Sequence, residues 1–168
     1  MDFSHNITGR IWIFGENIDT DQILPGYAMA EPTEKLKEFA LAGSEHPNFA
    51  KEVQPGDIII AGNNFGPGSS REQAAVALKN AGTGVIIAPS FARIFRKNAI
   101  NIGLPLVKAN LLAHFKHGQK AQVDLKEFKI TNLSTNEVFY FDPIAPNVMA
   151  TLEAGGLIEK VRKQLLDA

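Results

Sequence analysis

Apolar residues gather in three short runs in the first half of the chain. These runs occupy residues 10–14, 57–61 and 84–88, and glycine, proline or asparagine stands near their ends. Runs of this length between turn residues are typical of buried strands. The sequence therefore predicts three strands in this half.

Apolar residues at helical spacing follow the second and third runs. Residues 70–80 carry three alanines and a leucine at this spacing, and residues 91–102 place four apolar side chains near one face before Gly103. A glycine directly after such a pattern commonly ends a helix. Strands that alternate with helices imply parallel pairing with right-handed crossovers.

The pattern changes toward the C-terminus. Residues 121–124, 127–131 and 137–141 resemble short antiparallel strands, and residues 157–166 have the pattern of a closing helix. The chain of 168 residues contains no internal repeat or long linker, and its length suits one domain. We therefore expect residues 1–168 to form a single α/β domain.

Composition narrows the possible partners. Hydrophobic residues make up 45% of the chain and charged residues 21%, and the formal net charge is −1. Such a balance is ordinary for globular proteins and provides no basic field for nucleic acid. The N-terminus has no secretory pattern, and no apolar run approaches the ~20 residues that span a bilayer. We therefore expect a cytoplasmic protein without nucleic-acid or membrane partners.

Cysteine is absent from the sequence. The chain therefore has no thiol nucleophile and no thiolate ligand for zinc or an iron-sulfur cluster. Of the four histidines, only His114 and His117 are close in sequence, and no third ligand stands beside them. We expect this chain alone to hold no metal.

Residues 63–73, NNFGPGSSREQ, join the second strand to its helix, where open α/β folds bind ligands. Ser69 and Glu72 have the spacing of a capping box, worth about 1 kcal/mol. The cap leaves Arg71 unexplained, because a cation in the first helical turn costs about 0.3 to 1 kcal/mol. The helix N-terminus, the hydroxyls of Ser69 and Ser70 and the guanidinium of Arg71 together form a site that suits a carboxylate. The spacing matches neither a P-loop nor a dinucleotide fingerprint.

Residues 17–26, NIDTDQILPG, follow the first strand. Asp19, Thr20 and Asp21 are good turn and cap residues, and structure alone can explain them. If the two strands are neighbours, however, this acidic loop and the Ser-Arg loop face one cleft. Asp21 is then a candidate site residue.

Four segments resemble those of a known family: NIDTDQILPG, NFGPGSSREQA, PSFARIFRKNAINIGLPLV and LEAGGLIEKV. The family comprises the small subunits of 3-isopropylmalate dehydratases and homoaconitases, which are homologous to the swivelling domain of aconitase. The resemblance implies a swivelling β/β/α fold. It also implies a large partner subunit that holds a [4Fe-4S] cluster, in a heterodimer or heterotetramer. The reaction implied is the reversible dehydration of a 2- or 3-hydroxy acid.

The resemblance also implies roles for individual residues. Ser69 matches the catalytic base, Ser70 and Arg71 match the residues that bind the substrate carboxylate, and Asp21 matches an acidic active-site residue. For Asp21 we expect a supporting role that orients a partner residue. Arg93 stays outside this set, since pairing with a carboxylate such as Glu72 explains it equally well.

Substrate choice depends on residues 27–30, YAMA, where Tyr27, Ala28 and Met29 match the family's loop at the variable end of the substrate. No basic residue lies between Arg10 and Lys35. An unpaired buried carboxylate is costly, so an apolar substituent fits better. The expected substrate pair is 3- and 2-isopropylmalate, of leucine biosynthesis. The usual Tyr-Leu start of the loop is missing, and 2,3-dimethylmalate and homocitrate remain open. A non-catalytic regulatory module that binds carboxylates also remains open as an alternative function.

Overall fold

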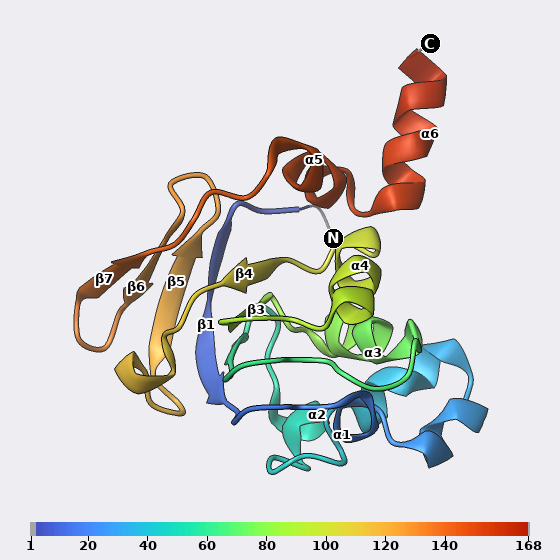
Figure 1. Ribbon diagram of the computed structural model, residues 1–168, viewed down its shortest axis with the longest axis horizontal. Coiled ribbons are helices and arrows are strands. Elements are labelled where there is room, and N and C mark those ends of the chain that lie inside the picture. Colours follow the sequence, from blue (N-terminus) through green and yellow to red (C-terminus); the bar gives the residue numbers. More distant parts are fainter. Residues whose placement is uncertain (1–2, 168) are drawn as a thin grey trace.

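A seven-stranded mixed sheet organises the computed structural model, which describes residues 3–167 (Figure 1). The strand order is β4-β3-β2-β1-β5-β6-β7. The strands are β1 (Asn6–Ile13), β2 (Ile58–Ile60), β3 (Val85–Ala88), β4 (Leu106–Lys108), β5 (Lys120–Asp124), β6 (Lys129–Asn132) and β7 (Glu137–Tyr140).

Strand β1 joins a parallel half-sheet to an antiparallel one. Its end pairs with β2 in parallel, with Ile11 beside Ile58, whereas its beginning pairs with β5 antiparallel, with Asn6 beside Asp124. β2, β3 and β4 continue the parallel half, and β6 and β7 continue the antiparallel half. The predicted parallel pairing of the first three strands is therefore confirmed, as is the antiparallel pairing of the last three.

Six α-helices are described: α1 (Thr20–Ile23), α2 (Phe49–Glu52), α3 (Gln73–Ala81), α4 (Arg93–Asn101), α5 (Pro146–Ala154) and α6 (Leu157–Asp167). Three short 3-10 helices accompany them: η1 (Gly26–Ala30), η2 (Thr33–Phe39) and η3 (Leu112–His114). Helix α3 begins three residues later than predicted, and α5 was not predicted. Among residues 3–167, no helix is long and apolar enough to cross a membrane.

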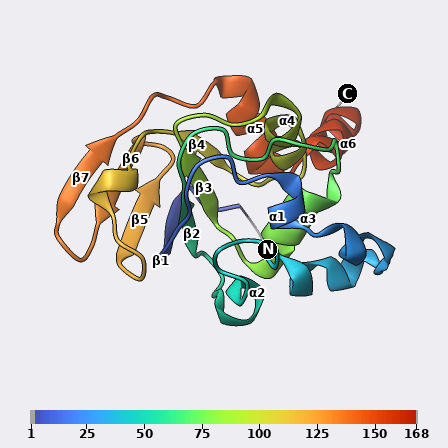
Figure 2. The ribbon, with the colours of Figure 1, turned by 60° about the horizontal axis from the view of Figure 1, so that its bottom comes forward.

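Alternate residues of the parallel strands face two apolar cores. Trp12, Ile59 and Ile86 face a core shared with α1, α3 and α4, whereas Ile58 and Ile60 face a second core that includes residues of β5 and β6. Figure 2 shows β5–β7 at one side of the molecule, whereas α1, α3, α4 and α6 lie toward the other side. The helices and the two half-sheets thus form the expected β/β/α arrangement.

A buried carboxylate ties β1 to the turn before β2. Asp57 is 2% exposed and accepts hydrogen bonds from the backbone N–H groups of Arg10 (3.0 Å) and Gln54 (2.9 Å). It also accepts from Trp12 Nε1 (3.0 Å) and pairs with Arg10 Nη2 (3.2 Å). These contacts fix the position of β2 relative to β1.

Candidate active site

The loops that leave the carboxyl ends of β1 and β2 lie side by side. Backbone N–H groups of Asn17 and Thr20 donate to the carbonyls of Asn63 and Pro67, at 2.9 Å each. In the opposite direction, Gly66 donates to Ile18 at 2.7 Å. Because β1 and β2 are parallel neighbours, their loops emerge at the same edge of the sheet. The predicted meeting of the acidic loop and the Ser-Arg loop is therefore confirmed.

At the centre of this junction, Ser69 contacts a buried threonine. Thr20 Oγ1 accepts a hydrogen bond from Ser69 N at 3.1 Å and lies 3.3 Å from Ser69 Oγ. Thr20 is 3% exposed, whereas Ser69 is exposed. Gly68 precedes this contact with a φ of +119°, and a Cβ there would lie 2.7 Å from Thr20 Oγ1. The close approach therefore requires glycine.

The predicted capping box of Ser69 and Glu72 is wrong. Glu72 itself is the cap residue of α3, with no side-chain cap hydrogen bond, and the Ser69 N–H is bonded to Thr20 instead. A tertiary contact between the two loops thus replaces the local one. The capping box of this region caps α1, where Asp19 Oδ1 accepts from Gln22 N at 2.8 Å and Gln22 Oε1 accepts from Asp19 N at 3.0 Å.

Arg71 connects the two loops through its guanidinium. Its Nη1 donates to the carbonyl of Leu24 at 3.1 Å and lies 3.2 Å from Asp21 Oδ1. The side chain of Arg71 is 26% exposed and that of Asp21 73% exposed. Since α3 begins at Gln73, Arg71 does not lie in the first helical turn, and the predicted conflict with the helix dipole is wrong. Its charge instead faces the end of α1.

The YAMA segment forms η1, directly after Leu24 and Pro25. Tyr27 is 69% exposed and packs edge-on against Phe39, with ring centroids 6.0 Å apart. Met29 is half-buried against the core, and Ala28 is fully buried within it. Of these three predicted substrate contacts, Tyr27 therefore presents the most accessible side chain, and Ala28 offers a ligand only its backbone.

Two residues at the site were missed in the sequence. The sequence pattern indicates only a turn residue at Thr20, and it indicates no site role for Asn98 of α4, whose Nδ2 donates to the carbonyl of Ser70 at 3.4 Å. Both contacts join segments far apart in the chain, so no local pattern indicates them. Arg93 is exposed at the start of α4 and has no ion pair with any residue of the described range 3–167. The alternative pairing with Glu72 is therefore not seen.

Two histidines meet at the end of β1. The rings of His46 and His117 stack with centroids 4.6 Å apart, and both side chains contact the backbone of Ile13. Partial burial, then the charges of His46 and Arg10, lower the pKa of His117, against the opposing influence of Glu52. Within residues 3–167, no three His, Cys, Asp or Glu residues lie close enough to hold a metal ion.

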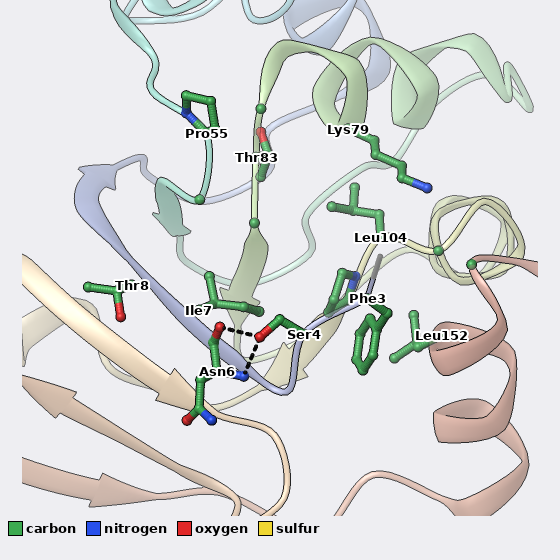
Figure 3. A pocket seen from close by; sticks show the side chains of 16 residues that line it. Phe3, Ser4, Asn6, Ile7, Thr8, Pro55, Lys79, Thr83, Leu104 and Leu152 are labelled. Atoms are coloured by element: carbon green, nitrogen blue, oxygen red, sulfur yellow. Dashed lines mark hydrogen bonds between the residues drawn. The ribbon is translucent and has the colours of Figure 1, made fainter. Parts of the chain in front are cut away.

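A cavity of about 380 Å³ lies at the amino-terminal ends of the parallel strands, opposite the end that carries the Ser-Arg loop (Figure 3). Its lining includes Ile7, Leu104 and Leu152, together with Lys79, whose ammonium donates to the carbonyl of Ile102. Burial lowers the pKa of Lys79. None of the predicted site residues lines this cavity.

Comparison with known proteins gives a consistent set of matches. A family model described as Aconitase C-terminal domain matches residues 14–111. The chain is 46% identical to the 3-isopropylmalate dehydratase small subunit of Aquifex aeolicus, over 94% of this chain and 95% of the relative. It is also 46% identical to the methanogen homoaconitase small subunit of Methanothermobacter thermautotrophicus, over 95% and 92%. The crystal structure of a 3-isopropylmalate dehydratase from Methanocaldococcus jannaschii superposes with a TM-score of 0.91, at 40% identity over 96% of each chain.

Proposed function

The chain belongs to the aconitase C-terminal domain family, and we propose that it is the small subunit of a hydro-lyase of the 3-isopropylmalate dehydratase type. One observation carries this proposal. A serine hydroxyl and a guanidinium from one loop are held against α1 and the residue that follows it, at the edge where parallel sheets bind ligands. The site supplies a potential base and a carboxylate-binding cation. Both are needed to dehydrate a hydroxy acid.

Each residue of the site has a proposed role. Arg71, with Ser70, binds a substrate carboxylate, because the planar guanidinium matches the two carboxylate oxygens. Ser69, as alkoxide, takes a proton from the carbon next to that carboxylate and returns it on rehydration. Asp21 contacts Arg71 and supports its position. Its exposed carboxylate is also free to orient a group of the partner subunit.

The proposal assigns the [4Fe-4S] cluster to the large subunit. This chain has no cysteine, and its described residues form no group of three metal ligands, so its own side chains do not suit a cluster. A cluster bound in the partner would supply Lewis-acid chemistry for the loss of the substrate hydroxyl. The present chain supplies the base and the carboxylate contacts.

The exposed position of these residues supports a site completed by another subunit. Ser69, Ser70, Asp21 and Tyr27 are all exposed in the isolated chain. Electrostatic catalysis requires a water-excluded site, which these residues do not form alone. We therefore propose a heterodimer or heterotetramer with the large subunit, acting in the cytoplasm.

The surface of η1 supports a substrate with an apolar substituent. The chain has no basic residue between Arg10 and Lys35. Tyr27 and Met29 offer apolar surface in η1, which begins two residues after Leu24, whose carbonyl accepts a hydrogen bond from Arg71. We propose 3- and 2-isopropylmalate as substrates, in leucine biosynthesis. The relatives named for 3-isopropylmalate dehydratase and for homoaconitase are both 46% identical to the chain, so the substrate assignment rests on the η1 surface.

Reconstitution tests the proposal. The chain is mixed with a cluster-loaded large subunit of the family, and formation of the unsaturated acid is followed by absorbance with 3-isopropylmalate, 2,3-dimethylmalate and homocitrate. We expect turnover to be fastest with isopropylmalate and absent with either subunit alone. A higher kcat/KM for homocitrate contradicts the substrate assignment.

The same assay separates an enzyme subunit from a carboxylate-binding regulatory module. A module binds a malate derivative in calorimetry without supporting turnover of any of the acids. That result contradicts the proposed enzyme function.

A further inference from the structure

The hydroxyl of Thr20 is a buried polar group within hydrogen-bond distance of the proposed base. It accepts the N–H of Ser69 at 3.1 Å and lies 3.3 Å from Ser69 Oγ, although the two residues are 49 positions apart in the chain. Thr20 is 3% exposed, so water is largely excluded from its hydroxyl.

The proton of the Thr20 hydroxyl has one evident acceptor. A threonine hydroxyl carries one proton and two lone pairs, and one lone pair already accepts the Ser69 N–H. Within residues 3–167, the other hydrogen-bond partner of Thr20 Oγ1 is Ser69 Oγ. Once Ser69 has lost its proton, its oxygen can only accept in this contact. Thr20 must then be the donor.

We propose that Thr20 is a positioning residue for the reaction, whose hydroxyl donates to Ser69 Oγ and stabilises the serine alkoxide while its lone pair holds the Ser69 backbone. This inference rests on the proposed function of Ser69 as base. A serine is a poor base unless donors stabilise its ionised form, and a donor in a buried position is not screened by water. Ser69 does not occupy the cap position of α3, which belongs to Glu72, and its own N–H is bonded to Thr20. The Thr20 hydroxyl is therefore placed to serve as the donor to Ser69 Oγ.

The geometry holds Thr20 ready for this role. Its backbone N–H donates to Pro67 at 2.9 Å, and the Asp19–Gln22 capping box fixes the start of α1. Gly68 lets the serine loop approach, because any Cβ there meets Thr20 Oγ1 at 2.7 Å. The 3.3 Å between the hydroxyls exceeds the usual 2.7 to 2.8 Å. Catalytic hydrogen bonds commonly shorten as charge develops.

The test compares Thr20→Val, which keeps the shape and removes the hydroxyl, with Thr20→Ser, which keeps the hydroxyl. Both are assayed in the reconstituted complex with 3-isopropylmalate. For Thr20→Val we expect kcat to fall by roughly 100-fold, the loss typical of one removed donor, with KM within about threefold. The ionisation of the base in the pH profile of kcat should move to higher pH. Thr20→Ser should keep the wild-type profile and kcat within about tenfold.

A matched control is Thr151→Val. Thr151 is also buried, and its hydroxyl donates to Asn147 within α5, which lies at the end of the molecule opposite α1 (Figure 1). This variant should keep wild-type kinetics. If valine at position 20 prevents folding, Thr20→Ala provides the same comparison, with the same expected shift.

Three outcomes overturn the inference: full activity of Thr20→Val, an equal loss in Thr20→Ser, or a loss of kcat with an unmoved pH profile, which indicates a structural role only. A wild-type complex that turns over none of the acids is a different result. It overturns the proposed function, and the role of Thr20 with it.

Discussion

The side chains of the candidate site are held in place by contacts between two loops. Thr20, Asp21 and Leu24 come from the first loop, and Ser69 and Arg71 come from the second. The guanidinium of Arg71 connects the two loops, because it contacts the carboxylate of Asp21 in α1 and the carbonyl of Leu24, directly after that helix. The Arg71 side chain is 26% exposed, so a substrate carboxylate can reach it.

Changes of Ser69 and Arg71 should separate base chemistry from binding. In the reconstituted complex, Ser69→Ala should lower kcat by at least roughly 1,000-fold, because the proton acceptor is lost. Arg71→Lys should mainly raise KM, by roughly tenfold or more, because an ammonium cannot form the two-pronged contact. Steady-state kinetics measure both. Arg93→Lys, at an exposed position, is the control for the charge exchange, and full activity of both site variants contradicts the assignment.

Gly68 offers a second residue-scale prediction. Gly68→Ala and Gly118→Ala both place a side chain at positive φ, which costs about 1 kcal/mol of unfolding free energy. A Cβ at Gly118 meets nothing within 4 Å, whereas one at Gly68 meets Thr20 Oγ1. Urea denaturation should show a larger loss for Gly68→Ala, because it adds this clash to the backbone cost that both variants share, and only Gly68→Ala should lose activity. Equal activities contradict a role for the close approach.

At the scale of elements, the buried Asp57 connects β1 to the turn before β2. In Asp57→Asn, a neutral amide replaces the carboxylate that accepts from two backbone N–H groups and pairs with Arg10. These donors then have a poorer partner. We expect the unfolding free energy to fall by about 2 kcal/mol or more, as measured by urea denaturation. Asp142→Asn, at an exposed position, should change it by less than about 0.5 kcal/mol. Equal values for the two variants contradict this account.

The stacked histidines near the end of β1 predict a dependence of stability on pH. Because folding lowers the pKa of His117, the unfolded chain binds a proton there more readily. The unfolding free energy should therefore be undiminished above pH ~6.5 and fall as the pH is lowered through the ordinary histidine range. Denaturation at pH 7.5 and 5.0 measures the change. His117→Gln should reduce it, and an unaltered pH dependence contradicts the prediction.

The observed bounds of the helices and strands show which of them the local sequence pattern predicts correctly. The strands predicted at residues 57–61 and 84–88 contain β2 and β3, and the helix predicted at 157–166 matches α6 within one residue. Strand β1 begins at Asn6, before the predicted start, because β5 pairs with its less apolar first half. The start of α3 was misplaced for a related reason, since Thr20 holds the serine that was expected to cap it. Contacts between distant segments decided both boundaries.

The site residues stay a prediction, whereas the meeting of the two loops that carry them is seen in the structure. The resemblance named Ser69, Ser70, Arg71 and Asp21, and the neighbouring strands brought their loops together as expected. The partners that fix them, Thr20 among them, were missed because their hydrogen bonds cross from one loop to another. Such contacts have no sequence periodicity.

For the whole molecule, α6 stands apart from both cores. None of its residues is buried, and its apolar side chains are largely exposed: Leu157, Ile158, Val161, Leu165 and Leu166. A chain that ends at Gly156 should therefore lose little unfolding free energy, under about 1 kcal/mol. Urea denaturation of the shortened chain measures this. A loss above about 3 kcal/mol contradicts the view that the fold is complete without α6.

The shared strand β1 also has a consequence during synthesis. The ribosome makes β1 first, and β2 and β3 can pair with its second half long before β5 exists. Residues 6–10 keep an unpaired backbone edge until residues 120–124 leave the exit tunnel. Open strand edges on nascent chains invite pairing with other chains. Fragments that end before Lys120 should therefore aggregate or require a chaperone, although they carry every residue proposed for catalysis.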